Sequence, residues 1–256
     1  NLPIFNALYS GFAISKKVVT TIIFLILVLL LFTFYIRFLF LVQRKKITKR
    51  EVRNAIAVTI VILIFSYPAM LSYDIFNYIT TAKVSFFYHE NPYIVMPIEL
   101  VGEPNLSFTR AANKIALYGP AWIIFTAIPH VLSFGSIVLA VFSFKVFIAL
   151  FYIATVWLIG KLSQNLFSVV LFAFNPLVLL ETLVSSHNDI VMMFFALLSF
   201  YFLDKRKVLV ACILLMISIL IKYATIALIP IFLFALFQTY KRKDIAWDTL
   251  FSLSAW

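Results

Sequence analysis

Long apolar stretches constrain this chain more than any other feature of its sequence. Residues 18–42, 55–71 and 136–160 each approach the roughly 20 residues that a helix needs to cross a bilayer. They explain why 64% of the 256 residues are hydrophobic and only 12% are charged, which leaves too little polar surface for a soluble domain of this size. We therefore predict an all-α fold, a polytopic transmembrane helical bundle.

The positions of lysine and arginine predict how the chain is threaded. Residues 43–54 carry a dense group of them, so the positive-inside bias places this loop in the cytoplasm. The segment that follows the second span, rich in Tyr, Asn and Pro, is then external. Residues 120–134 are apolar but short, and a crossing there would export most of the later cations. We expect them to form an interfacial helix that lies flat on the membrane.

The same placement of cations and apolar stretches predicts the domain organisation. We expect one transmembrane domain over residues 1–256, part of a longer chain, with an external loop at 72–135 that contains the interfacial helix. The net charge of +11 belongs to the loops between spans, so we do not expect nucleic acid as a partner. Cys212 is the only cysteine, which excludes an intrachain disulfide or a cysteine metal cluster.

Three polar clusters fall on the external side in this threading: the segment after residue 71, residues 185–189, and Lys222. In the first cluster, Asp74 follows a span directly and could act as a general base toward an acceptor hydroxyl. The alternative is that Ser72 and Asp74 cap the helix that follows. From spacing alone, capping is the commoner role.

Aromatic and amide residues in the external loop allow two interpretations. Asn91 and Tyr93 flank Pro92 in a polar turn. Tyr118 and Trp122 flank the start of the interfacial helix, where they would stack on sugar rings or, more commonly, anchor the helix at the membrane surface.

The remaining candidates are charged or polar residues near the outer boundary. His187, Asn188 and Asp189 could orient a hydroxyl or a phosphate, although Asn and Asp also cap helices. These are too few ligands for a metal, so we expect neither a metal nor a cofactor. Lys222 either reaches lipid headgroups or stabilises an anionic leaving group, and Arg110 is a similar candidate.

The order of these motifs resembles a known family. Tyr73-Asp74 with Tyr78, then Asn91-Pro92-Tyr93, Tyr118-Gly119-Pro120, Asn175-Pro176 and His187-Asn188-Asp189 resemble the polyprenol-phosphate-mannose-dependent mannosyltransferases. These are integral membrane glycosyltransferases of the GT-C class, and the bacterial α-(1→6)-mannosyltransferases look most similar. The resemblance covers roughly residues 66–230. This sequence has Tyr73 where the family has an arginine before the aspartate.

The resemblance implies a mechanism and partners. The donor would be a polyprenyl-phosphate sugar, with mannose as the sugar, and the acceptor a glycan or glycolipid at the outer face of the cell membrane. Transfer would be inverting, with Asp74 as the base. Lys222 and Arg110 would bind the donor phosphate, and the substrate would be bound by Tyr73, Tyr78, Asn91, Tyr93, Tyr118, His187, Asn188 and Asp189.

Two other classes share these features: a lipid-sugar flippase or transporter, and a surface-polysaccharide polymerase or ligase. A transporter would favour internal repeats and discontinuous helices at the membrane midplane, and the sequence shows no convincing repeat. The glycosyltransferase interpretation makes a geometric prediction, namely that Asp74, His187, Asp189 and Lys222 line one externally facing cavity.

Overall fold

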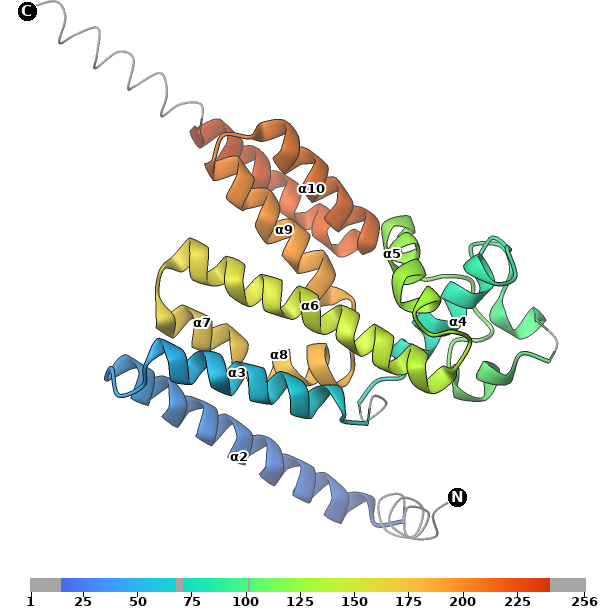
Figure 1. The fold of residues 1–256 in the computed structure, drawn as a ribbon, viewed down its shortest axis with the longest axis horizontal. Helices are drawn as coiled ribbons and strands as arrows, with labels where there is room; N and C mark the ends of the chain where they lie inside the picture. The colour runs from blue at the N-terminus through green and yellow to red at the C-terminus, as the bar shows by residue number, and fades with distance from the viewer. Residues whose placement is uncertain (1–14, 68–70, 101, 240–256) are drawn as a thin grey trace, which may run out of the picture.

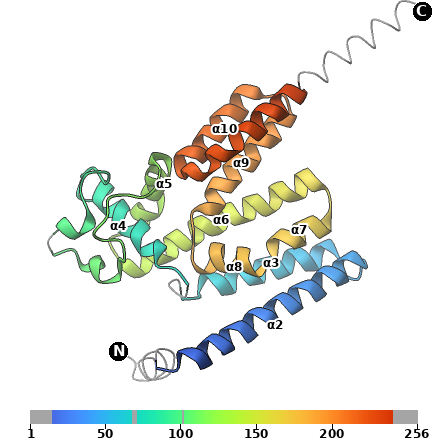
Figure 2. The same ribbon diagram turned by 180° about the vertical axis from the view of Figure 1, so that it is seen from behind.

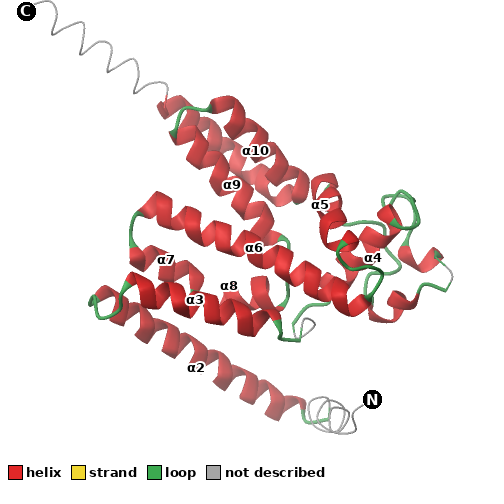
Figure 3. Ribbon diagram, in the orientation of Figure 1, coloured by secondary structure: helices red, strands yellow, loops and turns green. Residues whose placement is uncertain are grey.

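The fold is helical throughout the part of the chain that the structure describes. A computed structural model describes residues 15–67, 71–100 and 102–239, and every regular element within these ranges is a helix (Figure 3). The first 14 residues that we assigned to the domain, and those after 239, lie outside the described residues. The all-α prediction is confirmed for the described ranges.

The N-terminal hairpin consists of α2 (Lys17–Gln43) and α3 (Lys49–Ile64). The cationic loop between them ends in a capping box, in which Thr48 and Glu51 each bond to the backbone N–H of the other. None of the apolar window of α2 is buried in protein. Such a surface is costly in water, and hydrocarbon would cover it.

Two helices, α2 and α6 (Ile137–Ser163), are long and apolar enough to cross a membrane. A third crossing is possible if the bent pair formed by α7 (Leu166–Ala173) and residues 176–184 counts as one. The bend is 54°, and it falls at Asn175 and Pro176, where proline interrupts the helical hydrogen bonds.

The remaining helices of the bundle are short. The helix α3 begins and ends several residues before the predicted stretch 55–71. The helices α9 (Asp189–Asp204) and α10 (Val208–Ile221) have 16 and 14 residues, less than the roughly 20 that a straight crossing needs. After α10 the chain forms the 3-10 turn η5 (Tyr223–Leu228) and continues as a helix to residue 239.

The external loop of the prediction folds into a small lobe against one end of α6 (Figures 1 and 2). It contains α4 (Asp74–Phe86), the 3-10 turns η2 (Pro97–Glu99) and η3 (Pro104–Phe108), and α5 (Pro120–Val131). A buried ion pair holds the lobe together, because both oxygens of Glu103 lie 2.8 Å from Nζ of Lys83.

The helix predicted to be interfacial is α5. Its 12 residues span about 18 Å at the helical rise, too short for the hydrocarbon core, which agrees with the expectation that it does not cross. One face, including Trp122, is buried against the protein, while Ile124 and Ile128 are exposed. Its orientation relative to a membrane remains a prediction.

A buried lysine joins α6 to the end of α3. The ammonium of Lys145 donates to the carbonyl oxygens of Leu63 and Ser66 at 2.9 and 2.7 Å, and lies 3.0 Å from Oγ of Ser66. An ammonium has three hydrogens, and these contacts use all of them. The Leu63 carbonyl also accepts from the backbone N–H and the hydroxyl of Ser66, so Lys145 joins Ser66 in bonding to the end of α3 and faces the bundle interior.

Candidate functional site

Charged side chains from four segments meet at the junction between the lobe and the bundle. Nδ1 of His187 lies 4.0 Å from Oδ2 of Asp74 and 3.8 Å from Oδ2 of Asp189. Nζ of Lys222 lies 2.8 and 2.9 Å from the two oxygens of Asp189. The structure therefore brings Asp74, His187, Asp189 and Lys222 into one connected cluster. That they line an externally facing cavity, and the roles assigned to them, stay predictions.

Sequence reasoning missed a third carboxylate. Oε2 of Glu181 lies 3.5 Å from Nε2 of His187, on the opposite side of the imidazole from Asp74 and Asp189. Glu181 interrupts the apolar stretch 166–183, and an ionisable residue in a predicted membrane span indicates a functional role by default. That signal was available in the sequence.

The three carboxylates set the protonation of the imidazole between them. Burial by itself would lower the pKa of His187, but the nearby carboxylates of Asp189, Asp74 and Glu181 outweigh it and raise the pKa above its ordinary value. A protonated imidazole has an N–H on each side. It can therefore donate to Glu181 from one nitrogen and to Asp74 or Asp189 from the other.

Asp74 is not used as a helix cap. At the start of α4 the hydroxyl of Ser72 accepts the backbone N–H of Asp74 at 3.2 Å, and no side chain from the residue before the helix caps it. The Asp74 carboxylate instead accepts a 3.4 Å hydrogen bond from the Asn77 amide and remains 39% exposed. The capping alternative thus falls to Ser72, and the carboxylate is accessible for chemistry.

The loop that presents His187 has an unusual local structure. Residues 180–184 form a single turn of π-helix, a feature frequent at functional sites, and Ser186 has a positive φ of 57°. The backbone N–H of His187 donates to the carbonyl of Glu181 at 2.9 Å. This turn points the His187 imidazole back toward Glu181.

Tyr78 fixes the other side of that loop. Its hydroxyl lies 3.3 Å from both Oδ1 and the backbone N of Asn188, and burial raises the pKa of Tyr78, so the hydroxyl keeps its proton. The side chains of Tyr78 and Asn188 are each 1% exposed. Both hold the loop from within the protein, and neither caps α9 through its side chain.

Unpartnered polar atoms gather in the same loop. Within the described residues, the buried side-chain atoms without a hydrogen-bond partner are Oγ of Ser185, Oγ of Ser186, Nε2 of His187, Nδ2 of Asn188 and Nε1 of Trp122. Four of the five belong to residues 185–188. Buried polar groups are usually satisfied, so this concentration distinguishes the loop from the rest of the described chain.

A close backbone contact positions Lys222. The chain leaves α10 in an extended conformation at Lys222, and the backbone N–H of Gly119 donates to the carbonyl of Ile221 at 3.1 Å. A Cβ added at Gly119 would collide with the Leu220 carbonyl. Glycine is therefore required where α5 begins, because only it lets α5 approach the end of α10.

The other predicted site residues lie in the lobe around this cluster. The Arg110 guanidinium lies over the ring of Tyr73, 4.4 Å from its centre, next to Asp74 in the chain. The hydroxyl of Tyr93 donates to the carbonyl of Tyr118 at 2.8 Å, and Asn91 accepts the backbone N–H of Tyr93 at 3.0 Å. Asn91 thus forms the polar turn that its sequence context indicated.

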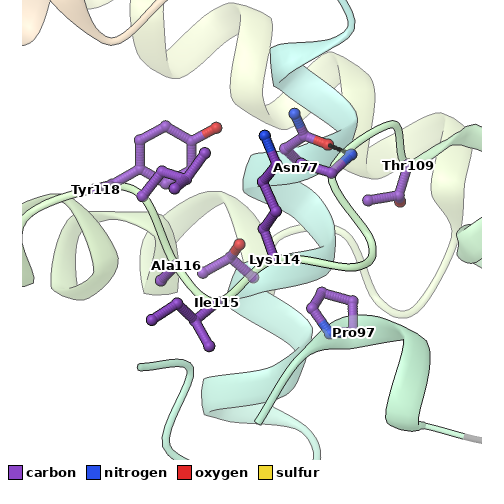
Figure 4. A pocket seen from close by; sticks show the side chains of 10 residues that line it. Asn77, Pro97, Thr109, Lys114, Ile115, Ala116 and Tyr118 are labelled. Atoms are coloured by element: carbon purple, nitrogen blue, oxygen red, sulfur yellow. Dashed lines mark hydrogen bonds between the residues drawn. The ribbon is translucent and has the colours of Figure 1, made fainter. Parts of the chain in front are cut away.

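A pocket opens beside Asn77, one turn along α4 from Asp74. Figure 4 shows the end of the Lys114 side chain next to the Asn77 amide, with Tyr118 and Thr109 on either side. Asn77 bridges the pocket and the carboxylate, since it donates to Asp74 while its oxygen accepts from the backbone N–H of Ala111 at 3.2 Å.

The cluster suits proton transfer and anion binding. Its carboxylates, Asp74, Glu181 and Asp189, are all accessible and can take a proton, and one lysine can stabilise an anionic leaving group. Across the described ranges, no three His, Cys, Asp or Glu side chains are arranged to hold a metal ion.

Comparison with known proteins gives one match. A family model described as alpha-(1→6)-mannopyranosyltransferase, N-terminal domain, matches residues 4–238. No curated protein and no solved structure matches the chain.

Proposed function

Because the chain belongs to the alpha-(1→6)-mannopyranosyltransferase family, and is thus a mannosyltransferase, we propose that it transfers mannose from a polyprenyl-phosphate donor with inversion. The resemblance of its motifs to that family is confirmed by a match that extends over most of the sequence. The proposal adds the donor class, the mechanism and the residues that carry them.

The observation that carries the proposal is the cluster itself. An accessible carboxylate, Asp74, and a cation, Lys222, belong to one set of connected charges through His187 and Asp189. Single displacement at an anomeric carbon requires a base for the nucleophile and a positive charge for the departing phosphate. The cluster offers a candidate for each requirement, Asp74 for the base and Lys222 for the positive charge, from different segments of the chain.

In the proposed reaction, Asp74 takes the proton of an acceptor hydroxyl as its oxygen attacks the anomeric carbon. The new bond joins that oxygen to the sugar, while the bond from the sugar to the phosphate oxygen breaks. The polyprenyl phosphate leaves with the electron pair, and Lys222 stabilises its growing charge. The proton stays on Asp74 until solvent removes it.

The surrounding residues receive supporting roles. We propose that the acceptor approaches Asp74 from the side of Asn77, whose amide holds the Asp74 carboxylate. Tyr78 and Asn188 position the His187 loop from inside the protein. The residues that would line the approach of the sugars and the donor phosphate are Tyr73, Asn91, Tyr93, Arg110 and Tyr118.

We further propose that the protein is a multi-pass protein of the cell membrane and that the site faces away from the cytoplasm. The helices α2 and α6 supply two apolar segments of sufficient length. In Figures 1 and 2 the cationic turn between α2 and α3 lies at the end of the α2–α3 hairpin that points away from the lobe. The positive-inside bias then puts the cluster on the outer side.

Transfer of radiolabelled mannose tests the donor class. The full-length protein in liposomes is given polyprenyl-phosphate mannose or a soluble nucleotide-linked mannose, with an α-(1→6)-linked mannose oligosaccharide as acceptor. The proposal predicts labelled product from the lipid donor alone. Product from the nucleotide sugar in the absence of any lipid donor would contradict it.

A further inference from the structure

Asp189 already pairs with Lys222, the cation that would bind the phosphate of the proposed donor. Both oxygens of Asp189 lie within 2.9 Å of the Lys222 ammonium. The two side chains are 42% and 44% exposed, so an incoming group can reach the pair from solvent. A phosphate that approaches Lys222 therefore meets a carboxylate of the same charge already bound there.

A second partner for Asp189 lies on its other side. Oδ2 of Asp189 is 3.8 Å from Nδ1 of His187, slightly beyond hydrogen-bonding distance. A small rotation of the Asp189 side chain would close that gap while the backbone of α9 stays in place. His187 is flanked by Glu181 on its opposite nitrogen, so the imidazole is held in position to receive a second carboxylate.

We propose that Asp189 is a mobile positioning residue, which passes from Lys222 to His187 when the donor phosphate arrives. The inference rests on the proposed function, because it takes the donor to be a prenyl monophosphate. In the empty site Asp189 compensates the charge of Lys222. In the loaded site the phosphate takes over Lys222, and Asp189 strengthens the hold on the imidazole next to Asp74.

This exchange links the two halves of the reaction. Asp74 and Asp189 approach the same nitrogen of His187, so an Asp189 that closes on this nitrogen offsets the positive charge that Asp74 faces. A carboxylate is a stronger base when the positive charge beside it is neutralised. Donor binding would thereby prepare Asp74 to take the acceptor's proton.

The test uses farnesyl phosphate, a short prenyl monophosphate, binding to the full-length protein in phosphatidylcholine nanodiscs. Farnesol, which has the same tail without the phosphate, measures binding to lipid and apolar surface alone. The variant Asp189→Asn removes the competing charge but keeps the shape of the side chain. It should bind farnesyl phosphate about tenfold more tightly, within the usual range of coupling between two sites, and should transfer mannose more slowly.

Tighter binding combined with slower transfer is the result that supports the exchange, because a merely structural role for Asp189 would weaken both. Unchanged or weaker binding of farnesyl phosphate by Asp189→Asn would overturn the exchange and leave the donor assignment intact. If neither protein bound farnesyl phosphate better than farnesol, the donor class in the proposed function would fall, and this inference with it.

A second variant covers the case in which Asp189→Asn does not fold. His187→Gln removes the cation to which Asp189 moves but leaves Lys222 and Asp189 unchanged. It should weaken binding of farnesyl phosphate several-fold, because Asp189 then has no alternative partner. Full affinity in His187→Gln would overturn the exchange. When His187→Gln is combined with Asp189→Asn, it should have little effect on farnesyl phosphate binding, because the double mutant has no carboxylate at position 189 to move.

Discussion

Oδ2 of Asp74 lies 4.0 Å from Nδ1 of His187, although one residue begins the lobe and the other precedes α9. The contact makes the lobe and the bundle share one chemical site. It also places the proposed base beside an imidazole that has carboxylates on both sides, which leads to a prediction about pH.

Stability should depend on pH through His187. Its pKa in the folded protein is raised because the three carboxylates outweigh the effect of burial. A raised pKa contributes stability that is complete below the unfolded value near 6.5 and is lost as pH rises through the folded pKa. The melting temperature in detergent should therefore fall over that interval, and His187→Gln should remove this component. A drop of equal size in His187→Gln would show that another group is responsible.

Lys145 should be required for stability. The variant Lys145→Met keeps the stem of the side chain but removes the ammonium that donates to the carbonyl of Ser66, and an acceptor left unpaired away from water costs about 1–3 kcal/mol. Lys161→Met, on the exposed end of the same helix, is the matched control. We expect a clearly lower melting temperature for the first variant alone, and equal melting temperatures would contradict the role of Lys145.

Gly119 should tolerate no side chain. In Gly119→Ala the new Cβ would collide with the carbonyl of Leu220, so α5 and the end of α10 must separate and Lys222 must shift. A misplacement of about 1 Å can lower a rate about 100-fold, and we expect a loss of that order in mannose transfer. Gly160→Ala is the control, because its Cβ would lie 3.4 Å from a methyl group of Val169. Similar activity in both variants would argue against the close approach.

Much of the fold could be predicted because the signals are strong and local. The apolar run 18–42 could only be a long helix, and the cation-rich loop after it marked a turn, as α2 and α3 show. The lengths of α9 and α10 follow the apolar stretches of the sequence, which charged residues bound at both ends. A straight membrane crossing needs about 20 residues, but helices that pack on each other and on the rest of the protein can be shorter.

The sequence predicted which residues of the site lie together, but not which atoms contact each other. Charge placement grouped Asp74, His187, Asp189 and Lys222, and the structure brings them together. The sequence did not indicate which carboxylate contacts which nitrogen, because that depends on the π-helical turn before Ser185 and on the positive φ of Ser186. Nor did it indicate the partners of Lys145, since a buried lysine can bond to any free carbonyl within reach.

The central claim is that Asp74 is the base, and one measurement tests it most directly. Mannose transfer from polyprenyl-phosphate mannose is compared among the full-length protein, Asp74→Asn and Asp204→Asn, with equal amounts of each folded protein. Asp204 ends α9 and is exposed, so it controls for loss of a carboxylate elsewhere. We predict that Asp74→Asn lowers the rate by about 10²- to 10⁴-fold, as expected for a lost general base, and that Asp204→Asn retains activity. Transfer by Asp74→Asn at the rate of the unmodified protein would contradict the account.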